Sequence, residues 1–152
     1  MTSYSASSYT DSSYFVSDVL PPLEATDLEI RLSGGAANSD FNASLGGAKS
    51  SVEVVNNFNN NIFDDVSSGE HGTGDTEYRC VYLHNSDATT PMNNIKIYIA
   101  SNTSATEDEW DIGLGTSGLN GTEQTIANES TAPISVTFLH PIVEADGLIP
   151  PD

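Results

Sequence analysis

Two neighbouring stretches, 77–84 and 95–99, constrain the fold more than any other part of the sequence. Side chains in the first alternate between two faces, and isoleucines occupy every second position of the other. A period of two residues is typical of a strand whose faces meet different surroundings. The connection 85–94 is rich in asparagine and contains Pro91, which stops one strand before the next begins. We therefore predict a strand pair as the rigid centre of the protein, with Cys80 packed inside.

Other short segments show the same alternation. In 27–32 we expect leucine and isoleucine to face inward and charged residues outward, and 134–139 is the last clear strand. Shorter candidates lie at 51–55, 110–114 and 124–128. No segment has the period of an amphipathic helix. About seven short strands joined by turns predict an all-β, antiparallel sandwich.

Chain length and local composition predict one domain with an extension at each end. A chain of 152 residues can bury a single core. We expect a Ser- and Tyr-rich extended arm at residues 1–24, the β-sandwich at 25–143 and a Pro-containing tail at 144–152. A disordered leader is the alternative for the first segment.

The aromatic residues of the arm are candidates for contact with a partner. Its tyrosines are five residues apart, a spacing that fits neither a helix nor a strand. Tyrosine provides a large contact area for little loss of entropy, so the arm could lie in a groove of another subunit. The predicted partner-binding residues of the arm and the tail are Tyr4, Tyr9, Tyr14, Phe15, Leu20, Leu148 and Ile149.

The charge of the chain excludes several classes of partner. Four Lys and Arg residues stand against 22 Asp and Glu residues, which gives a net charge of -18 and a pI near 4.1. Such a surface repels phosphates, so we expect neither a nucleic-acid nor a membrane partner. Acid excess also keeps a protein dispersed in concentrated salt, which indicates a marine or high-salt source. A surface that binds cations or a basic partner is the alternative.

The remaining features predict an unprocessed chain without a disulfide. Cys80 is the single cysteine, so no intrachain disulfide can form. The N-terminus has neither a basic region nor an apolar run, and we expect no signal peptide. No window approaches the 18 or more apolar residues that a membrane span needs.

Motifs for chemistry are missing from the sequence. The histidines lie far apart without metal-ligand spacing, and no Gly-x-Ser-x-Gly motif is present. We therefore expect no catalytic residues, no enzyme activity and no cofactor. Carboxylates in loops could bind Ca²⁺, although the spacing of a calcium loop does not occur, and solvated loop charge is the alternative. The candidate metal ligands are Asp64, Asp65 and Asp75.

Several blocks of sequence occur in an order that is found in a group of viral proteins. The blocks are Leu32-Ser-Gly-Gly-Ala-Ala-Asn38, Ala43-Ser-Leu-Gly-Gly-Ala48, Asn61-Ile-Phe-Asp-Asp-Val66, Gly74-Asp-Thr-Glu-Tyr-Arg-Cys80, Thr125-Ile-Ala-Asn-Glu-Ser-Thr-Ala-Pro133 and Val136-Thr-Phe138. Over residues 28–148 the chain resembles small virion structural proteins of tailed phages and of related haloarchaeal or marine viruses. In that group a further strand follows a Gly-x-Ile-Pro turn, whereas this chain ends at Asp152. We expect the missing strand to leave an edge open for pairing with a neighbour.

The resemblance implies a fold and a role. The fold would be an immunoglobulin-like β-sandwich. The role would be that of a capsid decoration or cement protein on the outer surface of the virion, made in the host cytoplasm. Its expected partners are the major capsid protein and copies of itself, for example in a trimer. The alternatives are a tail, fibre or spike component that contacts the host, and a Ca²⁺- or carbohydrate-binding adhesion module.

Overall fold

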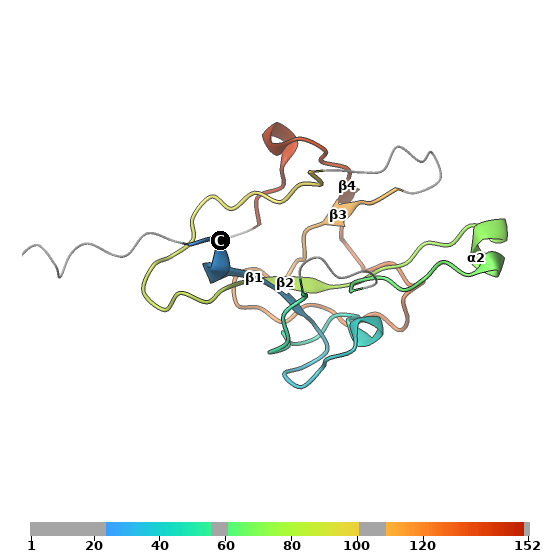
Figure 1. The fold of residues 1–152 in the computed structure, drawn as a ribbon, viewed down its shortest axis with the longest axis horizontal. Coiled ribbons are helices and arrows are strands. Elements are labelled where there is room, and N and C mark those ends of the chain that lie inside the picture. Colours follow the sequence, from blue (N-terminus) through green and yellow to red (C-terminus); the bar gives the residue numbers. More distant parts are fainter. Residues whose placement is uncertain (1–23, 56–60, 101–108, 151–152) are drawn as a thin grey trace, which may run out of the picture.

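A computed structural model describes residues 24–55, 61–100 and 109–150 (Figure 1). Its largest regular unit is an antiparallel pair formed by β1 (Leu28–Leu32) and β2 (Val81–Asn85). This pair lies at the centre of the described part of the chain and connects segments that are about fifty residues apart in sequence. The stretch 77–84 therefore supplies a central strand, but the predicted pair is wrong: the partner of β2 is β1, and the segment 95–99 instead meets Leu148 at a single bridge.

The second sheet is small, and helices are few. Strand β3 (Ile112–Gly113) pairs with β4 (Phe138–Leu139), also antiparallel. The α-helix is α2 (Ser68–Thr73), which lies at the tip of two extended segments that project from the body (Figure 1). Single-turn 3-10 helices occur at η2 (Ala25–Asp27), η3 (Phe41–Ala43) and η4 (Glu144–Asp146). The prediction that strands and extended chain, rather than helices, form this fold is confirmed for the described residues.

The register of β1 and β2 separates two faces. Leu32 stands opposite Val81 and Ile30 opposite Leu83, so these aliphatic side chains share one face. The polar partners Glu29 and His84 share the other face. The alternation predicted for both strands is therefore present.

Elsewhere, extended segments meet at single bridges rather than at full ladders. Arg31 bridges to Glu53 on the free side of β1, Gly47 to Glu123, and Ile97 to Leu148. The segments predicted as strands at 51–55 and 95–99 each contain one bridge, and the third bridge lies just before 124–128, but none of the three segments is assigned as a strand. The described residues form two two-stranded sheets and no seven-stranded sandwich.

The buried centre is small and largely polar. Leu32 and Val54 are the buried aliphatic side chains of the described residues, at 4% and 8% exposure. Beside them lie three fully buried serines: Ser33, Ser44 and Ser50.

Hydrogen bonds satisfy these buried serine hydroxyls. The Ser44 hydroxyl donates to the Cys80 carbonyl oxygen at 2.6 Å and accepts from the Ser33 N–H at 2.9 Å. The Gly46 N–H donates to the Ser33 hydroxyl at 2.9 Å. Because buried hydroxyls need partners, this network joins the end of β1, the loop after η3 and the start of β2.

Several local predictions are wrong. The strands expected at 110–114 and 134–139 are reduced to β3 and β4, and 134–135 form a turn in which Ser135 has a φ of +61°. The strand expected at 77–84 is shifted to β2, because the Tyr78 N–H donates to the Glu129 carbonyl and the Cys80 N–H to the Ser44 carbonyl. These bonds lie outside the β1 ladder. Helix α2 lies in a segment for which no helix was predicted, and its capping box pairs the Ser67 hydroxyl with the Glu70 N–H and the Glu70 carboxylate with the Ser67 N–H.

No helix in the three described ranges is long and apolar enough to cross a membrane.

Candidate functional site

A shallow apolar groove of about 240 Å³ runs along the aliphatic face of β1. One wall comes from the β1–β2 pair, and the other comes from the extended segment 95–98. Glu53 and Lys96 are the charged residues of its lining. The apolar lining consists of Leu28, Ile30, Val54, Leu83, Ile95, Ile97 and Tyr98.

Backbone hydrogen bonds hold the second wall in place. Ile97 and Leu148 exchange two bonds of 2.9 Å, and the Ile99 N–H donates to the Pro141 carbonyl at 2.7 Å. The predicted tail therefore contacts the segment after residue 94 within the same chain. The groove lies between β1 and the segment 95–98.

The groove leaves apolar side chains open to solvent. Leu28 and Ile30 are 38% and 39% exposed, and Tyr98 is 39% exposed. The prediction that both aliphatic residues face inward is correct for the face but wrong for the burial, because nothing in the described part of the chain closes the groove over them. Apolar surface of this kind gains free energy when another surface covers it, about 25 cal/mol per Å².

Exposed hydrophobic side chains extend beyond the groove. Thirteen large hydrophobic residues of the described ranges are exposed, against two aliphatic residues that are buried. Hydrophobic side chains exposed singly are normal, whereas apolar side chains that lie together, as in the groove, are typical of a surface that contacts a partner. Outside the groove the exposed residues are Val55, Val66, Val81, Trp110, Leu119, Ile134, Leu139, Ile142, Val143 and Ile149.

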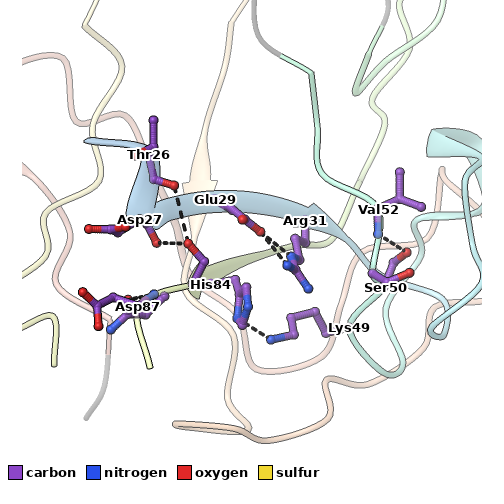
Figure 2. Close-up of polar contacts among 12 residues, drawn as sticks. Thr26, Asp27, Glu29, Arg31, Lys49, Ser50, Val52, His84 and Asp87 are labelled. Atoms are coloured by element: carbon purple, nitrogen blue, oxygen red, sulfur yellow. Dashed lines mark hydrogen bonds and ion pairs between the residues drawn. The ribbon is translucent and has the colours of Figure 1, made fainter. Parts of the chain in front are cut away.

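The opposite face of β1 carries a cluster of charged groups (Figure 2). The Glu29 carboxylate accepts from the Arg31 guanidinium at 2.6 Å, and both side chains are about one fifth exposed. Next to them the Lys49 ammonium lies 2.6 Å from His84 Nδ1, where the neutral ring accepts its proton. The cluster thus brings together two of the four Lys and Arg residues of the chain.

The cluster alters the protonation of its members. Burial, together with the nearby Arg31, lowers the pKa of Lys49. Burial lowers the pKa of His84, and the cations of Lys49 and Arg31 lower it further. The hydrogen bond from Arg31 lowers the pKa of Glu29. The neutral form of His84 is therefore the one that fits this face.

Arg79 ties together several distant segments. Its side chain is 1% exposed, and its Nη2 donates to Asn42 Oδ1 at 2.9 Å and to Glu129 Oε2 at 2.8 Å. Glu77 lies 3.2 Å from the same nitrogen, and the guanidinium carbon stands 5.5 Å from the centre of the Phe63 ring. A buried guanidinium with this set of partners is a structural anchor.

Glu77 also belongs to a group of carboxylates. One oxygen each from Glu70, Asp75 and Glu77 lies within 4.8 Å of the others. Burial raises the pKa of Glu77, and Arg79 opposes this shift. Hard cations favour such oxygen sets, and carboxylates at a surface also occur without an ion.

A second group contains a histidine. Glu109, Asp111 and His140 each offer a ligand atom within the same 4.8 Å limit, and all three are exposed. His140 Nδ1 lies 2.6 Å from the Trp110 carbonyl oxygen and 3.4 Å from Asp111.

The structure treats the predicted metal candidates differently. Asp75 lies in the group with Glu70 and Glu77, while Asp64 is exposed and contributes repulsion that raises the pKa of Glu77. Asp65 is exposed and is not part of either carboxylate group.

The structure describes only two of the predicted partner-binding residues, Leu148 and Ile149. Leu148 is half-buried against Ile97, and Ile149 is 55% exposed. The five residues of the arm, Tyr4, Tyr9, Tyr14, Phe15 and Leu20, lie outside the described residues.

Three of the six sequence blocks named above, 32–38, 43–48 and 125–133, meet in space. Glycines and alanines of 34–35 and 43–48 line a shallow hollow together with Thr125, Ile126 and Ala127. The Gly35 N–H donates to the Ala48 carbonyl at 2.8 Å, and the Ile126 N–H donates to the Leu45 carbonyl at 2.9 Å. These blocks therefore build one structural joint of the fold.

Sequence reasoning missed Arg79 and the Lys49–His84 contact. A signal was available for Arg79, since an arginine that alternates with Val81 and Leu83 stands on an apolar face and requires buried partners. Nothing in the sequence indicated the second contact, because the two residues are 35 positions apart.

Comparison of the chain with protein-family models, with curated proteins and with solved structures finds no match.

Proposed function

We propose that this protein is a virion structural protein that decorates the outer capsid surface and acts by assembly rather than by catalysis. The observation that carries the proposal is that, among the residues that the structure describes, thirteen large hydrophobic side chains are exposed while two aliphatic ones are buried. A chain with this surface gains stability when partners cover it. The resemblance of its sequence blocks to small virion proteins supports the viral setting.

The proposed partners are the major capsid protein and further copies of this chain, for example in a trimer. A net charge of -18 opposes binding to nucleic acid and to anionic membranes. We place the acidic surface toward solvent on the outside of the particle. The apolar groove along β1 and the exposed residues near the C-terminus, such as Ile142 and Ile149, would then face neighbouring subunits.

The proposed assembled fold is an immunoglobulin-like β-sandwich. Antiparallel pairing of β1 with β2, and the bridge from Arg31 to Glu53 on the other side of β1, supply part of one sheet. The extended segments that meet at single bridges could lengthen into ladders when a neighbour holds them. Far-ultraviolet circular dichroism of free and assembled protein checks this. A gain in strand signal on assembly is expected, and an unchanged spectrum would contradict it.

Deletion of residues 2–23 tests the capsid role. The shortened protein should fold and yet fail to attach to particles, because the aromatic arm is proposed to make the attachment. Normal occupancy of the shortened protein on purified particles would exclude the arm from this role. Copy number separates this function from the alternative of a tail, fibre or spike part. A decoration protein should approach the copy number of the major capsid protein, whereas a tail part should be far less abundant.

A second candidate, a Ca²⁺- or carbohydrate-binding adhesion module, is favoured by the carboxylate group Glu70, Asp75 and Glu77. Calcium should raise the unfolding temperature of such a module, and chelation should lower it. The decoration role predicts no response to either treatment. A Glu70→Gln, Asp75→Asn variant is the matched control, since it should abolish any calcium effect.

A further inference from the structure

The β1 groove is open on one side and has a definite chemistry. Its lining is mostly apolar, with Leu28, Ile30 and Tyr98 more than a third exposed, and its charged members are the cation Lys96 and the carboxylate Glu53. The ammonium group of Lys96 has a weak bond of 3.4 Å to the Glu144 carbonyl and is otherwise directed to the surface. An occupant should therefore be apolar or aromatic, extended, and able to place one acidic group beside Lys96.

The first 23 residues of the chain supply such a segment. Residues 14–20 read Tyr-Phe-Val-Ser-Asp-Val-Leu, with aromatic and aliphatic side chains on both sides of Asp18. Asp11 and Asp18 are the only acidic residues of this region, which holds no Lys or Arg. The remainder of the chain holds 20 of the 22 acidic residues, so this segment is the one that approaches another copy with the least repulsion.

The connection to the body favours a second copy over the same chain. The arm joins the structure at Glu24, and the turn η2 leads directly into β1, which is itself a wall of the groove. Pro21 and Pro22 lie between segment 14–20 and this joint, and prolines favour an extended chain over a tight reversal. A return of the segment onto its own β1 would need such a reversal within a few residues.

We propose that residues 14–20 of one copy bind in the β1 groove of a second copy, with Asp18 beside Lys96. The exchange buries aromatic and aliphatic surface of the arm against Ile30, Leu83 and Tyr98. It rests on the proposed assembly role and names the surface through which copies join. A segment that extends from one copy to the next also allows rings or trimers to close.

The test uses two full-length variants, each with one cysteine, in a Cys80→Ala background. One population carries Ser17→Cys in the arm and the other carries Glu53→Cys in the groove lining. After mixing and mild oxidation, a covalent heterodimer is expected. An arm variant, Phe15→Ser with Val19→Ser, should reduce its yield by at least about tenfold, since two apolar contacts are lost.

Two controls keep the result specific. Ser130 is exposed and does not line the groove, so Ser130→Cys should give little heterodimer with the Ser17→Cys variant. Tyr98→Ser should weaken the cross-link, and because that side chain is partly exposed the variant should remain folded by circular dichroism.

The outcomes separate the two proposals. A heterodimer that needs the arm side chains supports the exchange. A Ser17→Cys, Glu53→Cys double variant in the same background checks for a contact within one chain. A disulfide that forms in this double variant but not between the two single variants would overturn the exchange, as would equal yields with Ser130→Cys. If the exchange fails while the protein still decorates particles, only this inference is wrong. If it succeeds and the protein is absent from particles, only the proposed function is wrong.

Discussion

At the scale of single residues, Arg79 has the largest expected influence on stability. Its buried guanidinium neutralises Glu77, whose Oε2 atom is buried and has no hydrogen-bond partner. Replacement by methionine should destabilise the protein by about 3–5 kcal/mol, because it leaves that carboxylate buried without a cation. Urea unfolding measures the change.

If the buried charge of Glu77 is the cause, replacing the other carboxylate partner of Arg79 should cost much less stability than replacing Arg79 itself. Glu129→Gln should lower stability by only about 0–1 kcal/mol, because Glu129 is 41% exposed and Arg79 keeps its other partners. Adding Glu77→Gln to Arg79→Met should recover part of the loss. Equal effects of Arg79→Met and Glu129→Gln would show that the anchor does not work through the buried charge.

His84 should make stability depend on pH in a defined window. Burial and the cations of Lys49 and Arg31 lower its pKa below the ordinary value of 6.5, while Glu29 opposes them. The unfolded chain therefore takes up the proton first as pH falls, and stability present above pH 6.5 is lost as the pH drops below it. Unfolding midpoints in urea at pH 7.5, 6.5 and 5.5 should fall more steeply for the native protein than for His84→Gln.

The comparison isolates this one group. Glu77 has a raised pKa and so contributes in the opposite direction, losing stability as pH rises, but it is present in both proteins. Lys49→Met should also flatten the dependence, since it removes a cation that lowers the pKa of His84. Parallel pH profiles for the native protein and His84→Gln would contradict the assignment.

At the scale of elements, the joint between the loop 44–48 and the segment 123–126 depends on one glycine. Gly46 has a φ of +98°, and a Cβ there would collide with the Gln124 carbonyl. Gly35 is a matched control with a φ of +103° and open space around it. Gly35→Ala should destabilise by about 1–2 kcal/mol through its backbone alone. Gly46→Ala should add about 1–3 kcal/mol through the clash. Equal losses in thermal unfolding would argue against a tight joint.

Alternation in the sequence correctly predicted the strand that forms a regular hydrogen-bonded ladder with a neighbour. The strand at 27–32 appears as β1, and its faces are as expected. Burial was harder to predict, since Leu28 and Ile30 face a groove that the described chain does not close. Alternation with a period of two residues shows which side chains share a face, but it does not show what covers that face.

Contacts between distant loops could not be read from the pattern. Ser44 is buried because its hydroxyl reaches the Cys80 carbonyl, 36 positions away. Serine in a loop normally indicates solvent, so composition suggested the opposite. Helix α2 differs, because Ser67 and Glu70 form a capping signature that was visible in the sequence. Among candidate site residues, the arm could be chosen from its aromatic content, whereas the groove required the fold.

At the scale of the whole molecule, net charge should govern the response to salt. A chain of charge -18 repels itself, and raising the ionic strength from 0.1 M to 1 M shortens the screening length from about 10 Å to about 3 Å. Potassium chloride over this range should raise the unfolding temperature by about 2–4 °C, which corresponds to about 1 kcal/mol for a chain of this length. Sucrose at matched osmolality is the control. A flat or falling unfolding temperature in potassium chloride would mean that specific ion pairs outweigh the repulsion.

The same charge should oppose aggregation through the exposed apolar surface. In the proposed assembly, the acidic body keeps copies apart until a segment of low charge bridges them. Assembly through an almost neutral arm, and dispersion through an acidic body, are then two consequences of one uneven distribution of charge along the chain.

A cryo-electron microscopy reconstruction of the virion tests the central claim, assembly on the capsid through the apolar surface, most directly. The account predicts density for this chain on the outer capsid surface, with the β1 groove covered by segment 14–20 of a neighbouring copy. Absence of the protein from the capsid shell, or a copy on the shell with Leu28, Ile30 and Tyr98 still open to solvent, would contradict it.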